Sequence, residues 1–120
     1  MASILRVNTI TDASSNNSTA TSTVFSGTAK AFCRADNAAG LRNTFNIASG
    51  TDNGTGNYTY TFTNNMSSNF TSGTAVAITN GARMSTYSNT QTSSYDTDTH
   101  NESGTDTDAA TATNTFGDLA

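Results

Sequence analysis

The chain has 120 residues, a length that suits one domain and argues against a large multi-site enzyme. Its net charge of -4 argues against nucleic acid and anionic membrane surfaces as partners, since both bind basic patches. Only 33% of the residues are hydrophobic, whereas Thr, Ser and Asn number 25, 15 and 15. A chain this polar buries a thin core, so we expect a lone subunit to be marginally stable and to depend on partner copies.

Targeting signals are missing from the sequence. The single cysteine, Cys33, permits no internal disulfide, and the first residues lack the pattern of a secretion signal. The longest apolar runs are a few residues, too short to span a bilayer. We therefore expect a protein made in a reducing compartment, not secreted by a signal peptide and not inserted in a membrane.

The sequence begins with an arm. Four large apolar side chains form a short patch that could pair as a strand, namely Ile4, Leu5, Val7 and Ile10. Residues 12–23 contain no large apolar side chain and predict an extended or flexible segment. Two interpretations stay open, a disordered terminus and an arm whose apolar tip docks on another subunit. We take residues 1–23 as an N-terminal extended attachment arm and residues 24–120 as a β-sandwich head domain.

The first strand of the head is predicted over residues 28–35. Lys30, Phe32 and Arg34 lie on one face of this strand, and the alternate positions carry alanines and Cys33. A face of small residues suits close packing against another sheet. A turn over residues 36–40 then leads to a returning strand.

Residues 41–66 predict a β-hairpin with one apolar face. Phe45 and Ile47 alternate with polar or small residues before the loop 52–57, which is rich in Gly, Asn and Asp. After the loop, Tyr58, Tyr60 and Phe62 alternate with threonines. β-branched and aromatic residues at a period of two favour strands over a helix.

Later strands are predicted over residues 74–80, with Val76 and Ile78 on one face, and within residues 84–101 and 108–116. No helix of ordinary length is visible. The fold class is therefore all-β, an antiparallel β-sandwich or small barrel. The predicted core consists of Phe32, Phe45, Ile47, Tyr58, Tyr60, Phe62, Val76 and Ile78.

The last strands are polar on both faces, and neither face is apolar enough for a conventional core. We expect them to lie on the surface or in a hydrated, hydrogen-bonded stack. Proline is absent and charges are few, so exposed strand edges lack their usual protection. Edges that are already paired need none, which favours a tight homo-oligomer.

Asp96, Asp98, His100 and Glu102 are the candidate metal ligands. At i, i+2, i+4 and i+6 they project from one strand face, and clustered oxygen ligands suit Ca²⁺ or Mg²⁺. The alternative, a solvated acidic face that keeps the assembly soluble, is the interpretation we prefer. The prediction is therefore no metal and no cofactor.

Catalytic chemistry has little support in the sequence. His100 is the only histidine, and Cys33 lies on a different strand with Lys30 and Arg34 facing away from it, so an inert thiol is expected. Asp96 and Asp98 could serve a glycosidase, but that reaction needs carboxylates opposed across a cleft, usually with aromatic platforms. A chain without Trp and with a thin core is poorly suited to such a cleft.

The segment LRNTFNIASGTDNGTGNYTYTFTNNM, residues 41–66, is similar to a T-D-N-G-T-G-[DN]-Y-T motif of tail-fibre and related virion proteins of marine and other tailed bacteriophages. The upstream TAKAFCRADNAAG resembles that family's K-A-W-V-x-F-N-G-x-G, with Phe32 in place of Trp and Cys33 in place of Val. The ending FGDLA and the opening ILRVNTITDASS also resemble family segments, whereas residues 85–115 are more polar. The resemblance implies a trimeric β-structured virion appendage without enzymatic activity.

Two functions stay open. One is a fibre or decoration component on the tail or capsid surface of a virion, made in the host cytoplasm, whose partners are its own copies and other virion proteins. The other is a receptor-binding tip module for a host surface glycan, with exposed Tyr87 and Tyr95 among its contacts.

Overall fold

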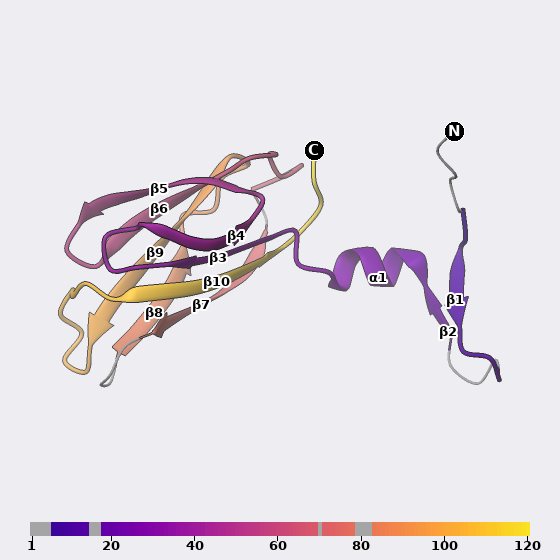
Figure 1. Cartoon of the computed structure of the whole chain (residues 1–120), viewed down its shortest axis with the longest axis horizontal. Coiled ribbons are helices and arrows are strands. Elements are labelled where there is room, and N and C mark those ends of the chain that lie inside the picture. Colours follow the sequence, from indigo (N-terminus) through magenta and orange to yellow (C-terminus); the bar gives the residue numbers. More distant parts are fainter. Residues whose placement is uncertain (1–5, 15–17, 70, 79–82) are drawn as a thin grey trace.

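The computed structural model describes residues 6–14, 18–69, 71–78 and 83–120. Strands predominate among these residues, which confirms the all-β class. Figure 1 shows a two-layered head with a narrow arm to one side. In chain order the elements are β1 (Thr9–Thr11), β2 (Ser18–Ala20), α1 (Thr21–Gly27), β3 (Ala31–Ala35), β4 (Leu41–Phe45), β5 (Ile47–Gly54), β6 (Asn57–Phe62), β7 (Ser72–Ile78), β8 (Arg83–Ser88), β9 (Ser94–Asn101) and β10 (Ala110–Phe116).

The head consists of two four-stranded sheets that pack face to face. The first sheet has the strand order β4-β3-β10-β7, and the second sheet has the order β5-β6-β9-β8. All of these pairings are antiparallel. The sheets remain separate, so of the two architectures predicted from the sequence the head adopts the sandwich and not the barrel.

The arm is folded rather than extended. β1 and β2 pair as a short antiparallel ribbon, and α1 leads from the ribbon to the head. In Figure 1 the ribbon and the helix project away from the sandwich. The predicted boundary between residues 23 and 24 falls inside α1. The first strand of the head is β3, which follows this helix. Ile4 and Leu5 of the predicted attachment patch lie outside the described residues.

The β5–β6 hairpin confirms the second strand of the predicted hairpin. The predicted first strand is wrong in part, because it divides at Asn46 between β4 of the first sheet and β5 of the second, and β5 extends to Gly54 into the predicted loop. The two strands pair antiparallel on either side of a tight turn. Gly56 has a φ of 72°, in a region that residues with a Cβ rarely enter. A Cβ on Gly56 would also lie 2.5 Å from the carbonyl oxygen of Thr99. Glycine is therefore required at this position for both conformation and space.

Large tyrosines of the second sheet face small side chains of the first sheet. Tyr58, Tyr60 and Tyr95 are fully shielded from solvent. The inner face of β3 contributes the small buried residues Ala31, Cys33 and Ala35. The predicted packing of this small-residue face against another sheet is confirmed.

Three hydrogen bonds between hydroxyl groups cross the interior, and we term them the tyrosine–threonine ladder. The pairs are Tyr60–Thr111 at 2.8 Å, Tyr95–Thr113 at 2.6 Å and Tyr87–Thr115 at 3.1 Å. The expectation that the C-terminal strands are too polar for a core is therefore wrong. A threonine hydroxyl paired with a tyrosine hydroxyl is satisfied, and the threonine methyl group then packs as an apolar group.

Half of the predicted core is correct. Ile47, Tyr58, Tyr60 and Phe62 are buried. For the other four residues the predicted burial is wrong in the single chain, because they lie on the outer face of the first sheet. Their exposed fractions are 37% for Phe32, 52% for Phe45, 59% for Val76 and 37% for Ile78.

Local geometry explains these outward side chains. Asn46 has a φ of 57°, and the chain passes there from the first sheet to the second, so Phe45 and Ile47 do not share a strand face. In β7 the ring of Tyr87 would lie 2.5 Å from a Cβ on Gly73. The inward positions of β7 hold this glycine and two alanines, and the larger valine and isoleucine point outward.

Candidate functional site

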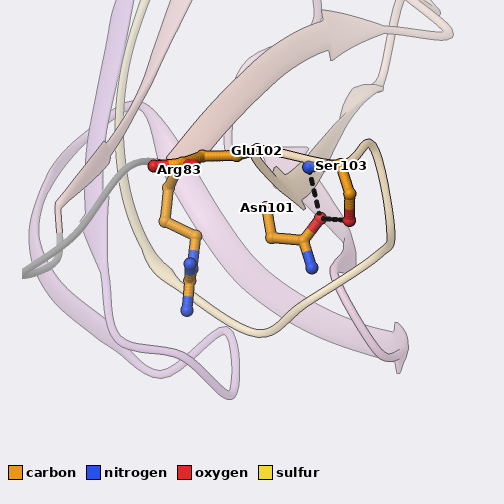
Figure 2. A pocket seen from close by; sticks show the side chains of 4 residues that line it. All are labelled: Arg83, Asn101, Glu102 and Ser103. Carbon is orange, nitrogen blue, oxygen red and sulfur yellow. Dashed lines mark hydrogen bonds between the residues drawn. The ribbon is translucent and has the colours of Figure 1, made fainter.

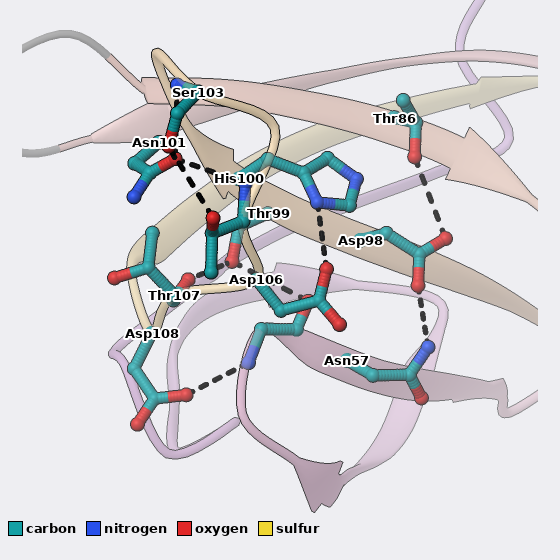
Figure 3. A network of polar contacts seen from close by, with 12 residues as sticks. Asn57, Thr86, Asp98, Thr99, His100, Asn101, Ser103, Asp106, Thr107 and Asp108 are labelled. Atoms are coloured by element: carbon teal, nitrogen blue, oxygen red, sulfur yellow. Dashed lines mark hydrogen bonds and ion pairs between the residues drawn. The ribbon is translucent and has the colours of Figure 1, made fainter.

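The outer face of the second sheet carries a network of polar side chains centred on β9 (Figure 3). Asp98 accepts a hydrogen bond from Asn57 Nδ2 at 2.5 Å and another from Ser88 Oγ at 2.8 Å. Thr86 Oγ1 also donates to Asp98, at 3.4 Å. All three donors are neutral, so this arrangement positions the carboxylate without neutralising it.

Asp96 is held in the same way, one step along the strand. It accepts hydrogen bonds from Thr59 Oγ1 at 2.6 Å and from Asn89 Nδ2 at 2.6 Å. The donors again come from β6 and from the end of β8, the two neighbours of β9. The two aspartates therefore form a rigid acidic row along the middle of this face.

The four candidate metal ligands do not converge on one point. His100 Nδ1 lies 2.8 Å from Asp106 Oδ1, across the turn that follows β9. β9 ends at Asn101, so Glu102 lies in that turn and not on the strand face predicted for it. Within the described part of the chain, no group of three or more His, Cys, Asp or Glu residues could hold a metal ion.

A hollow of about 360 Å³ lies beside the same turn (Figure 2). Its lining side chains are Arg83, Asn101, Glu102 and Ser103. Asn101 Oδ1 accepts hydrogen bonds from the backbone amides of Ser103 at 3.0 Å and Thr105 at 2.9 Å. The amide oxygen of this asparagine is thus used to form the turn.

Asp108 joins two loops of the head, a role that the sequence did not predict. Its Oδ1 accepts a hydrogen bond from the Gly56 amide at 2.8 Å and one from the Tyr58 hydroxyl at 3.3 Å. The Tyr58 hydroxyl in turn accepts from the Ala109 amide at 3.2 Å. A signal for this contact was present in the glycine-rich turn, because a glycine amide is accessible to a carboxylate.

Cys33 and His100 lie on different sheets and do not form a nucleophile–base pair. Cys33 is buried on the inner face of the first sheet, whereas His100 lies on β9 of the second sheet and pairs with Asp106. Burial raises the pKa of the Cys33 thiol to about 11. A thiol with a raised pKa holds its proton at neutral pH and is a poor nucleophile.

Tyr87 and Tyr95 do not form the exposed pair predicted for glycan contacts. Tyr95 is fully buried, and Tyr87 is half-buried with its ring stacked on that of Tyr95 at a centroid distance of 4.6 Å. Burial raises the pKa of both phenols. The prediction is wrong because both rings point inward as members of the tyrosine–threonine ladder.

The outer face of the first sheet exposes several large apolar side chains, and we term it the apolar face. It consists of Phe32, Phe45, Val76 and Ile78 with Arg34 among them. Phe32 lies opposite Phe45 in the strand register, and the two rings stack at a centroid distance of 5.9 Å. Side chains of this kind are expected on a surface that contacts another molecule.

The arm exposes apolar side chains as well. The exposed fractions are 44% for Val7, 53% for Ile10, 41% for Val24 and 65% for Phe25. α1 buries none of its residues. Where the helix meets the head, a hollow of about 620 Å³ is lined by residues that include Phe25, Phe45 and Leu119.

Comparison of the chain with protein-family models, curated proteins and solved structures finds no match. Across the described ranges, no helix has the length and apolar character needed to cross a membrane.

Proposed function

We propose that this chain is a non-enzymatic structural protein of a bacteriophage virion, a homotrimeric fibre or decoration component on the tail or capsid surface. The observation that carries the proposal is an arm that stands apart from the head. β1 and β2 are exposed throughout, and the seven-residue α1 has no buried residue. Because an isolated helix of this length is marginal in water, contact with another chain would stabilise it.

The resemblance of residues 41–66 to tailed-phage virion proteins supports the particle as that partner. The chemistry of the head fits a non-catalytic role, because its reactive groups already serve the structure. Asp96 and Asp98 fix neighbouring strands, Asp108 joins two loops, and the Cys33 thiol is buried. The apolar face supports self-association, as the thin core predicted from composition requires.

Co-sedimentation with particles depleted of this protein tests the proposal. Wild-type protein is expected to sediment with the particles, and the double variant Ile10→Asp/Phe25→Asp is expected to stay in solution. Thr55→Asp is the matched control, since it adds a carboxylate at the exposed hairpin turn and removes no hydrogen bond of the structure. Equal binding of all three proteins, or no binding by the wild type, contradicts attachment through the arm.

A receptor-binding tip for a host surface glycan is the second candidate. The observation that favours it is the row of amide, hydroxyl and carboxylate groups on the outer face of the second sheet. Such groups can exchange hydrogen bonds with sugars. Adsorption of the purified protein to host cells would favour this candidate, whereas binding to depleted particles alone would favour the structural one.

A further inference from the structure

The apolar face contains Arg34, a cation without an ion-pair partner among the described residues. Arg34 is exposed and lies opposite Asn43 on one side and Ala112 on the other in the strand register. Arg34 takes part in neither the Arg42–Asp36 nor the His100–Asp106 ion pair. Exposed aromatic rings around an arginine are the composition typical of the centre of a protein interface.

The outer face of the second sheet has the opposite charge, and we term it the acidic face. Asp96 and Asp98 form its central row, and their hydrogen bonds come from neutral side chains. Among the described residues of β5, β6, β8 and β9, the one Lys or Arg is Arg83, which lines the turn hollow at the start of β8. The central row of this face therefore presents negative charge.

We infer that the apolar face of one copy docks on the acidic face of a second copy. Arg34 then meets the carboxylates of Asp96 and Asp98, which is the charge complementarity that sets orientation at interfaces. The phenylalanine rings meet Met84, which is 59% exposed, and the methyl groups of the outward threonines. A methionine thioether against an aromatic ring is a favourable contact.

A symmetric contact is disfavoured by the same charges. Two apolar faces placed together would bring Arg34 close to Arg34 of the partner subunit, and two acidic faces would bring aspartates together. A contact between two different faces leaves a free face at each end, so it closes into a ring or continues as a filament. The two faces lie on opposite sides of the sandwich, so the contact stacks copies into a filament and does not close after three. The inference therefore rests on the fibre component of the proposed function and not on its homotrimer.

Complementation between two variants tests the contact. Arg34→Glu reverses the charge of the apolar face and removes no hydrogen bond seen in the structure. Thr61→Arg adds a cation to the acidic face at a half-buried outer position of β6. By light scattering over a concentration series, each variant alone is expected to self-associate at least about tenfold more weakly than the wild type. An equimolar mixture is expected to form a one-to-one complex, because each variant retains one intact face.

Arg6→Glu, the same charge reversal in the arm, is the matched control and is expected to assemble like the wild type. Thr86→Arg is a second acidic-face variant, and thermal unfolding checks that each variant is folded. Assembly of either face variant like the wild type, or no association in the mixture, overturns the inference. A wild-type monomer also overturns it, whereas the co-sedimentation experiment decides attachment to the particle independently.

Discussion

In the interior of the head, three tyrosine hydroxyls each pair with a threonine hydroxyl, whereas Thr97 Oγ1 is buried with no hydrogen-bond partner. A buried hydroxyl without a partner costs about 1–3 kcal/mol, whereas replacing both partners by apolar groups of the same shape is nearly neutral. The tyrosine–threonine ladder therefore contributes less through its net hydrogen-bond energy than through the specificity of its pairing. Each tyrosine of the ladder has one threonine opposite it at hydrogen-bond distance.

Tyr95→Phe tests this account. The variant leaves the Thr113 hydroxyl buried without its 2.6 Å partner, so the free energy of unfolding is expected to fall by about 1–3 kcal/mol. The double variant Tyr95→Phe/Thr113→Val removes both hydroxyls and is expected to recover part of that loss. Urea unfolding of the wild type, the two single variants and the double variant measures the coupling. Additive losses would contradict the pairing.

Alkaline pH is expected to destabilise the head. Burial raises the pKa of Tyr60 from 10.0 to about 12 and that of Cys33 from 9.0 to about 11. The folded state holds these protons more tightly than the unfolded chain, so the stability they contribute is complete below pH 9 and falls as the pH rises toward 11 and 12. Urea unfolding at a series of pH values measures the decline.

The two groups can be separated by substitution. Cys33→Ala is expected to remove the part of the decline that begins near pH 9, and the tyrosine part, which begins near pH 10, is expected to remain. Near-ultraviolet absorbance of tyrosinate should rise together with unfolding. Ionisation of all tyrosines at pH 10 in the folded protein would contradict their burial.

At the scale of elements, the sequence predicted those features that depend on alternation and turn chemistry. The β5–β6 hairpin follows from residues 57–62 and the glycine-rich turn before them. The sequence could not show which face of a strand points inward when both faces are plausible. Val76 and Ile78 were assigned to the core by size, but the inward side of β7 carries alanines and Gly73, where a Cβ would lie 2.5 Å from the Tyr87 ring.

The candidate site was predictable only in part, for a related reason. The outward positions of Asp96 and Asp98 follow from the period of two along β9, and the structure confirms them. The end of β9 at Asn101 depends on a local turn held by that side chain. The period of two continued past this end, so the sequence pattern wrongly placed Glu102 on the strand face with the other candidate ligands. The contact of Asp108 with Gly56 joins residues far apart in the chain and had no periodic signal.

Gly56→Ala tests the hairpin turn against a matched glycine. Gly56 and Gly104 have φ values of 72° and 78°, so alanine should cost each about 1 kcal/mol in backbone strain. A Cβ on Gly104 meets nothing within 4 Å, whereas on Gly56 it would lie 2.5 Å from the Thr99 carbonyl oxygen. We expect Gly56→Ala to lose about 1–3 kcal/mol more than Gly104→Ala in urea unfolding, from overpacking. Equal losses would contradict the close approach.

At the scale of the whole molecule, a compact head and an exposed arm differ in how they are stabilised. The head has an interior of tyrosines, threonines and small residues, whereas the ribbon and α1 have no buried residue. Composition predicted a chain with too little apolar material for a large core. It did not predict that part of this material, at Phe32, Phe45, Val76 and Ile78, lies on the surface.

Hydrogen exchange measured by mass spectrometry should separate the two parts. Amides of residues 9–11 and 18–27 are expected to exchange at rates close to those of an unfolded chain, because a seven-residue helix and a ribbon of three-residue strands have little stability of their own. Amides of β9 and β10, the central strands with buried threonines, are expected to exchange slowest.

Binding to depleted particles provides the decisive comparison. If the arm attaches the subunit to a particle, residues 9–11 and 18–27 should gain protection there, and the protection of the head strands β9 and β10 should stay unchanged. If the subunit attaches through the head, the added protection should appear on the head strands and the arm should remain fast. Slow exchange of the arm in the free monomer would contradict its dependence on a partner chain, since α1 has no buried residue to hold it closed.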